Sequence, residues 1–103
     1  MNISVSFHIE ISTRKRGRFR MEVEHFYSSD QVERFKIHGK NRFIIMEKRL
    51  AVKRQPWKIT EGQFNTSDIE EAAMAIKDMQ DSIDEYLKKR NGASGGYASY
   101  RNN

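Results

Sequence analysis

Basic side chains are concentrated in one short stretch of this 103-residue sequence. Five of the seven residues from position 14 to position 20 are cationic: Arg14, Lys15, Arg16, Arg18 and Arg20. Cations at this spacing can contact several phosphate groups, and the release of condensed counterions then favours binding. The stretch therefore predicts a polyanion-binding site. The alternative is a charged hairpin tip that only prevents edge-to-edge aggregation.

Aromatic and further basic residues are expected to share a surface with this cluster. Period-two alternation places Arg18, Arg20 and Phe26 on one face of a strand. Cations of later strands could join that face: Arg34, Lys36, Lys48 and Lys58. Bases stack on aromatic rings while phosphates follow the charges, so this face suits single-stranded DNA or RNA. Acidic residues on the same face weaken its field: Glu10, Glu22 and Glu24.

The charge of the chain is unevenly distributed along its length. Residues 1–65 carry 14 Lys and Arg against 7 Asp and Glu, whereas residues 66–90 carry 4 against 7. The formal net charge of the whole chain is +5. A basic first part indicates a polyanionic partner, although a charge of this size also serves solubility.

The remaining residue types give little support to catalysis or metal binding. The chain has no cysteine, which excludes disulfides, thiolate zinc ligands and a thiol nucleophile. The three histidines, His8, His25 and His38, are expected on different strands, without the spacing of metal ligands. No glycine-rich phosphate loop or nucleophile elbow is present. We therefore predict a non-enzymatic domain with no catalytic residue, metal or cofactor.

A second candidate site is apolar. Residues 43–46 form a continuous apolar run, which is typical of a strand covered on both faces. A three-residue loop before it would set Ile37 opposite Phe43, so that Ile44 and Met46 would face away from a covering helix. Such a patch marks a protein interface, here a homodimer or another partner, unless the sheet itself curls over it. The alternative function is therefore a protein–protein interaction or regulatory module, homodimeric and without a nucleic-acid role.

The basic cluster should lie at the tip of a β-hairpin. Residues 3–11 and 18–27 both alternate polar and apolar side chains. A loop over residues 13–17 sets Ile11 opposite Phe19 and Ile9 opposite Met21 on one face, with Val23 and Tyr27 on that face too. On the other face, acid meets base in the pairs Glu10–Arg20 and Glu22–His8. Both faces therefore favour the same register.

Three further strands and one helix are expected to complete the fold. The strands cover about residues 32–38, 42–48 and 57–64, and the helix covers residues 68–90. Ser67 and Glu70 form a capping box, and Gly92 is a suitable stop. Lys88, Lys89 and Arg90 would then lie in the last turn of the helix. Its apolar stripe should contain Ile69, Ala72, Ala73, Ile76, Met79, Ile83, Tyr86 and Leu87.

Together these elements predict an α+β fold, an antiparallel meander sheet of four to five strands with one long C-terminal helix packed on one face. Residues 1–90 would form a single domain, followed by a flexible Gly/Ser/Tyr tail over residues 91–103. The first strand contains no continuous apolar run, so we expect a cytoplasmic protein without a signal peptide or membrane contact.

The order of elements over residues 3–90 resembles the layout of the PUR-type and Whirly-type single-strand binders. In those families a helix backs one face of the sheet, subunits or repeats pair, and the sheet grips nucleic acid. The resemblance concerns topology alone, so it implies a mode of binding but assigns no role to any residue.

Overall fold

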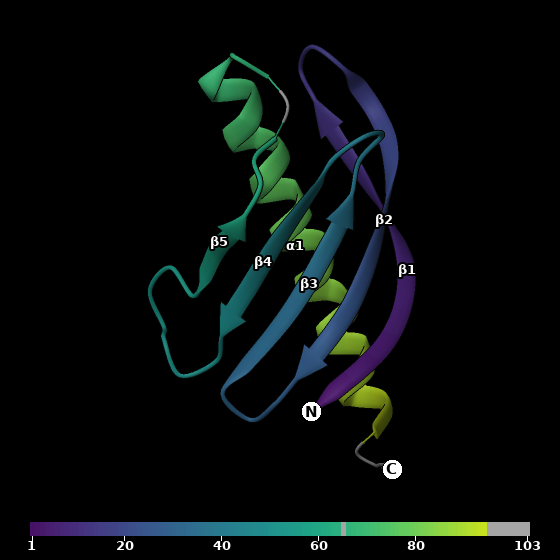
Figure 1. Cartoon of the computed structure of the whole chain (residues 1–103), viewed down its shortest axis with the longest axis vertical. Coiled ribbons are helices and arrows are strands. Elements are labelled where there is room, and N and C mark those ends of the chain that lie inside the picture. The colour runs from purple at the N-terminus through teal and green to yellow at the C-terminus, as the bar shows by residue number, and fades with distance from the viewer. Residues whose placement is uncertain (65, 95–103) are drawn as a thin grey trace.

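The computed structural model describes residues 1–64 and 66–94, and it shows one antiparallel sheet backed by one helix (Figure 1). The strands are β1 (Asn2–Thr13), β2 (Gly17–Ser28), β3 (Val32–His38), β4 (Phe43–Arg49) and β5 (Trp57–Glu61). They follow one another across the sheet in sequence order, and α1 (Ile69–Ser94) crosses behind them. The predicted α+β meander with a C-terminal helix is confirmed.

The β1–β2 hairpin has the predicted register. Ile11 pairs with Phe19 and Ile9 with Met21, while Glu10 pairs with Arg20. One expectation for β2 is wrong. A bulge at Phe26 sets both Phe26 and Tyr27 opposite Arg34, so Tyr27 lies on the outer face of the sheet, away from α1. The Arg34 guanidinium lies 4.9 Å from the centre of the Tyr27 ring.

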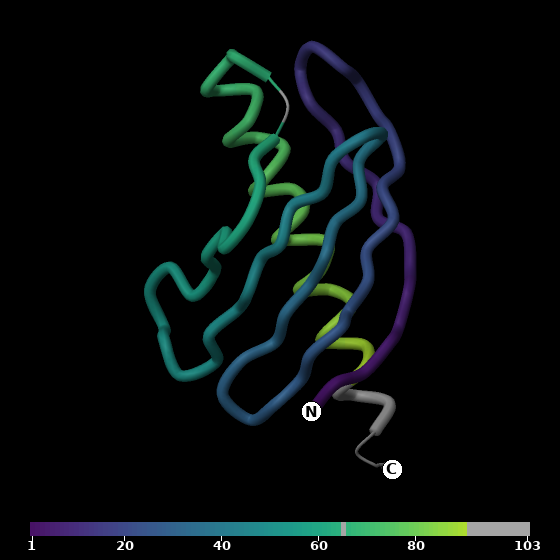
Figure 2. Tube along the Cα trace, in the orientation of Figure 1, coloured from purple at the N-terminus to yellow at the C-terminus, as the bar shows by residue number. Residues whose placement is uncertain are grey.

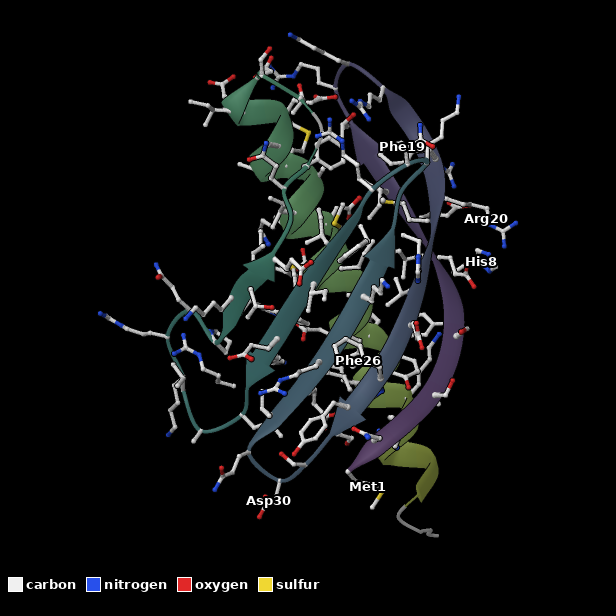
Figure 3. The ribbon with its side chains drawn as sticks, in the orientation of Figure 1. Met1, His8, Phe19, Arg20, Phe26 and Asp30 are labelled. Atoms are coloured by element: carbon white, nitrogen blue, oxygen red, sulfur yellow. The ribbon has the colours of Figure 1, made fainter. Side chains whose placement is uncertain are left out.

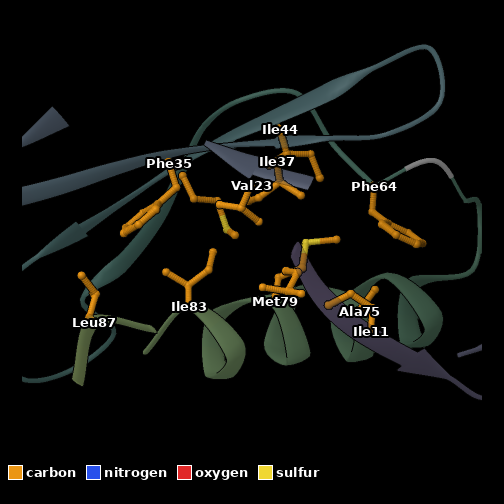
Figure 4. Close-up of a cluster of buried hydrophobic side chains, with 12 residues drawn as sticks. Ile11, Val23, Phe35, Ile37, Ile44, Phe64, Ala75, Met79, Ile83 and Leu87 are labelled. Atoms are coloured by element: carbon orange, nitrogen blue, oxygen red, sulfur yellow. The ribbon is translucent and has the colours of Figure 1, made fainter. Parts of the chain in front are cut away.

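The predicted register between β3 and β4 is wrong by one residue. Ile37 pairs with Ile44 and Phe35 with Met46, because the loop contains four residues, Gly39 to Arg42, rather than three. Ile44 and Met46 therefore face α1 and belong to the core, with 4% and 0% of their surfaces exposed. Figure 4 shows Ile44 on the sheet side of this core, opposite Met79 and Ala75 of the helix.

The helix starts and ends differently from the prediction. Asp68, rather than Ser67, caps α1, because its carboxylate accepts hydrogen bonds from the backbone N–H groups of Glu70 and Glu71. The helix also continues past Gly92 to Ser94, so Lys88, Lys89 and Arg90 do not lie in its last turn. The rest of the expected tail, residues 95–103, lies outside the described residues.

The buried stripe of α1 is shifted at its start. Ala75, Met79, Ile83 and Leu87 are buried, whereas Ile69 and Ala73 of the predicted stripe are exposed. The position one turn before Ala75 is filled by Glu71, which is only 3% exposed.

The carboxylate of Glu71 binds the tip of the β1–β2 hairpin. It accepts a hydrogen bond from the Thr13 hydroxyl at 2.6 Å and one from the backbone N–H of Lys15 at 3.3 Å. These donors, with Thr13 first, hold the pKa of Glu71 below its ordinary value. The Lys15 ammonium lies 2.6 Å from Asp68, and the backbone N–H of Ser12 donates to Asp78. The hairpin tip is thus fixed to the start of α1.

A glycine makes the return from β5 to the helix possible. Gly62 has a φ of 83°, and a Cβ at this position would collide with the carbonyl oxygen of Phe43 in β4. The close approach allows the chain to carry Phe64 into the core.

Replacing Gly62 should therefore destabilise the fold more than replacing another glycine with a similar backbone conformation. Gly17 has a φ of 71° but open space around its Cα. Gly17→Ala should lower the free energy of unfolding by about 1–2 kcal/mol, the strain of a left-handed alanine. Gly62→Ala should add a further ~1–3 kcal/mol for the steric conflict. Urea denaturation measures both, and equal losses would contradict the close contact with Phe43.

Candidate nucleic-acid interface

The candidate site lies where the first hairpin parts from the rest of the sheet. Pairing between β2 and β3 ends at Glu22 and His38, yet pairing between β1 and β2 continues to Thr13 and Gly17. Residues 17–21 of β2 therefore have no partner on their β3 side. Figure 2 shows that the two hairpin tips lie at the same end of the molecule as the start of α1, with a separation between them.

A cleft of about 770 Å³ occupies this separation. Its walls come from the start of β2, from the β3–β4 turn and from the segment that follows β5. Four cations line it: Arg16, Arg20, Lys40 and Arg42. Three phenyl rings also line it: Phe19, Phe43 and Phe64. This size is within the range of small-ligand sites, about 300–1,000 Å³.

The aromatic residues differ in how much surface they offer. Phe64 is buried, and the Arg16 guanidinium lies 4.8 Å from the centre of its ring. Phe43 is half-buried, and the Lys36 ammonium lies 4.3 Å from the centre of its ring. Phe19 is half-buried and lies near the start of β2 (Figure 3). A flat ligand could therefore contact Phe19 and Phe43, while Phe64 supports the floor of the cleft.

The cations at the mouth of the cleft are available to a ligand. The side chains of Arg20, Lys40 and Arg42 make no ion pair or hydrogen bond with another residue in the described part of the chain. In Figure 3 Arg20 reaches away from the body of the sheet. Lys40 and Arg42 can therefore approach phosphate without first breaking an internal contact, whereas Arg20 stands opposite Glu10 and helps to lower the pKa of that carboxyl.

The outer sheet face, by contrast, pairs most of its charges internally. Arg18 lies 2.6 Å from Glu10, and this contact lowers the pKa of the Glu10 carboxyl. Arg34 lies 3.3 Å from Glu47, and Lys58 stands opposite Glu47 in the register. The outer face, for which acidic residues were already expected among the cations, is therefore charge-mixed, with one basic cleft at its end.

The predicted cluster is only partly assembled in the cleft. Arg16 and Arg20 line it, Arg14 is exposed in the turn beside it, and Lys36 covers Phe43. Lys15 is instead paired with Asp68, and Phe26 lies farther along the outer face (Figure 3).

Three predicted placements are wrong. Lys48 does not lie on the outer face, because its register partner Glu33 faces the helix, and its ammonium lies 2.6 Å from Asp84 of α1. Ile44 and Met46 are core residues, as the one-residue change of register requires, and cannot anchor a partner.

No binding role was predicted for Lys40, in a turn, or for Arg42, at the start of the strand predicted over residues 42–48. A usable signal was present. In an antiparallel meander the first and third turns lie at the same end of the sheet, so the cations of residues 14–20 and of residues 40–42 must approach one another. The cleft itself depends on the unequal lengths of the two hairpins.

A second polar cluster is buried between the sheet and α1. His25 is fully buried, with Nε2 lying 2.7 Å from the Glu33 carboxylate and Nδ1 lying 2.8 Å from the Tyr86 hydroxyl. A carboxylate can only accept, so Nε2 carries the ring proton and Nδ1 accepts from Tyr86. Burial lowers the pKa of His25, and the hydrogen bond to Glu33 opposes this shift in part. Every polar atom of the imidazole therefore has a partner, as expected of a structural residue.

Comparisons with known proteins do not identify the chain. No protein-family model, curated protein or solved structure matches it. Within residues 1–64 and 66–94, no group of three or more histidine or carboxylate side chains could hold a metal ion. Over the same residues, α1 is too polar to cross a bilayer.

The burial of His25 makes stability depend on pH in a defined window. In the unfolded chain His25 takes up a proton near its ordinary pKa of 6.5, whereas the folded protein resists protonation. Above about pH 6.5 the free energy of unfolding should therefore not depend on the protonation of His25. Below that pH it should fall as the pH is lowered, by at most about 1.4 kcal/mol per pH unit.

His25→Gln should reduce the slope of unfolding free energy against pH between 5 and 6.5. Tyr86→Phe should lower stability but keep the slope, because the buried imidazole remains. Denaturation at several pH values measures both variants. The carboxyls of Asp68 and Glu71, whose pKa values are lowered, act only at lower pH. An unchanged slope in His25→Gln would contradict this assignment.

Proposed function

We infer that this protein binds single-stranded nucleic acid, without catalysis, through the cleft at the open end of its sheet. One observation carries the proposal. Three cations that make no ion pair with a described residue, Arg20, Lys40 and Arg42, line a cleft that also exposes parts of two phenyl rings. This combination serves unpaired nucleotides, because phosphates require cations and bases require flat apolar contacts.

The size of the cleft favours a single strand over a duplex. A base stacked within a double helix cannot reach the ring of Phe19 or Phe43, whereas an unstacked base can enter between the two walls. Arg16 and the exposed Arg14 add positive potential beside the mouth, and Lys36 adds it at the outer face. Phe26 offers a further ring on that face for a strand that continues beyond the cleft.

The alternative of a protein-interaction module loses its proposed anchor, since Ile44 and Met46 are buried. Homodimerisation stays a prediction, and a sheet edge is the remaining surface for it. The edge strand β1 is 12 residues long and carries Val5, which is 38% exposed. A cytoplasmic location likewise stays a prediction.

Fluorescence anisotropy with labelled oligonucleotides tests the proposal. The protein should bind a single strand more tightly than the matching duplex, with an affinity that falls as salt is raised. The triple variant Arg20→Ser/Lys40→Ser/Arg42→Ser should weaken binding at least about tenfold. It should also reduce the slope of log affinity against log salt by about 2, because each single-strand phosphate contact contributes about 0.7.

A charge-matched variant separates the cleft from general electrostatics. Lys53→Ser/Arg54→Ser/Lys88→Ser also removes three positive charges, from the β4–β5 connection and the helix, outside the cleft. It should retain most of the affinity. Equal weakening by both triple variants would contradict a binding site at the cleft, and no binding even at low salt would contradict the proposed function.

A further inference from the structure

The cleft contains one carboxylate, and its position sets it apart from the cations. Among the described residues that line the cleft, Glu22 alone is acidic. It pairs with His38 at the last position where β2 and β3 are joined, so it stands at the closed end. Glu22 is exposed and makes no ion pair with a described residue, whereas Glu24, two positions away, lies 3.8 Å from His38.

The cations lie farther toward the mouth. Arg20 is two residues beyond Glu22 along β2, about 7 Å at the rise of a strand. Lys40 and Arg42 belong to the turn that follows His38. A nucleotide whose phosphate contacts these cations would therefore direct its base toward Glu22 and the ring of Phe43, which lie on the same face of the sheet.

A carboxylate at this end discriminates among bases by their hydrogen-bond donors. It repels phosphate, and it accepts N–H groups from a base edge. Guanine presents two adjacent donors on its Watson–Crick edge, the N1–H and the N2 amino group, which match the two carboxylate oxygens. Adenine and cytosine each present one amino donor, and unpaired thymine presents one imino donor. Only guanine can therefore form a bidentate contact with Glu22.

We propose that the closed end of the cleft is a guanine-selective subsite in which the Glu22 carboxylate accepts the N1 and N2 hydrogens of an unpaired guanine. The proposal rests on the proposed function, since the phosphates of the same strand hold the base in place. The rest of the strand is then bound without regard to its sequence.

Four oligonucleotides test the subsite. Each is a labelled oligothymidylate with one central guanine, adenine, cytosine or hypoxanthine, so that a single base differs and no quadruplex can form. The guanine oligonucleotide should bind about five- to tenfold more tightly than those with adenine or cytosine. Hypoxanthine keeps N1–H but lacks the N2 amino group, so its affinity should fall between these values.

Two isosteric variants separate the possible outcomes. Glu22→Gln should lose the preference for guanine while still binding all four oligonucleotides, whereas Glu24→Gln should keep the preference. If Glu22→Gln tightens binding of all four oligonucleotides equally, Glu22 only repels phosphate and the guanine subsite is excluded. Binding without preference by the wild-type protein also overturns the subsite but leaves the proposed function intact. The absence of binding to any oligonucleotide overturns both.

Discussion

The contact between Glu71 and the hairpin tip is the constraint on which the shape of this molecule depends. The last part of the β1–β2 hairpin extends beyond β3, where no neighbouring strand supports it. The buried Glu71 carboxylate supports it from the helix instead, through the Thr13 hydroxyl and the Lys15 backbone. A buried carboxylate without such donors would be costly, so the helix start and the hairpin tip require each other. The cleft lies between the part of this hairpin that extends beyond β3 and the β3–β4 turn.

The same arrangement divides the charges of the chain by role. Lys15 forms an ion pair with Asp68 at the acidic start of α1. On the outer face, Arg18 pairs with Glu10, and Arg34 pairs with Glu47. Exposed pairs of this kind contribute little to stability, but they cancel the field of the sheet face. Arg20, Lys40 and Arg42 make no ion pair with a described residue, and they line the mouth of the cleft. These three cations give the cleft a positive potential, and low-dielectric walls strengthen such a field.

The sequence could predict those parts of the fold in which several independent signals agree. The register of the first hairpin follows from both faces at once, because apolar pairs and acid–base pairs select the same alignment. The register of β3 and β4 could not be predicted in this way. Residues 43–46 are apolar at every position, so alternation alone is compatible with either register. The observed register follows from a four-residue loop, one residue longer than predicted.

Other features were missed because a local pattern was overruled by tertiary contacts. Alternation along β2 predicts that Tyr27 faces α1, but the extra residue in the bulge at Phe26 places Tyr27 on the outer face. Glu71 is acidic within a buried stripe, and the distant Thr13 hydroxyl and Lys15 backbone N–H make that position tolerable. Lys40 and Arg42 acquire a role through the neighbouring hairpin, which is far away in sequence. The basic stretch of residues 14–20 was predicted as a candidate site, and only part of it faces the cleft.

The most direct test of a binding site at the cleft is to map backbone amide chemical shifts by NMR during titration with a single-stranded oligonucleotide. The largest changes should occur in three segments that surround the cleft, residues 16–22, 38–43 and 62–64. The amides of the β4–β5 connection and of the second half of α1 should change little. Largest changes in those latter regions, or no changes at all, would contradict the account.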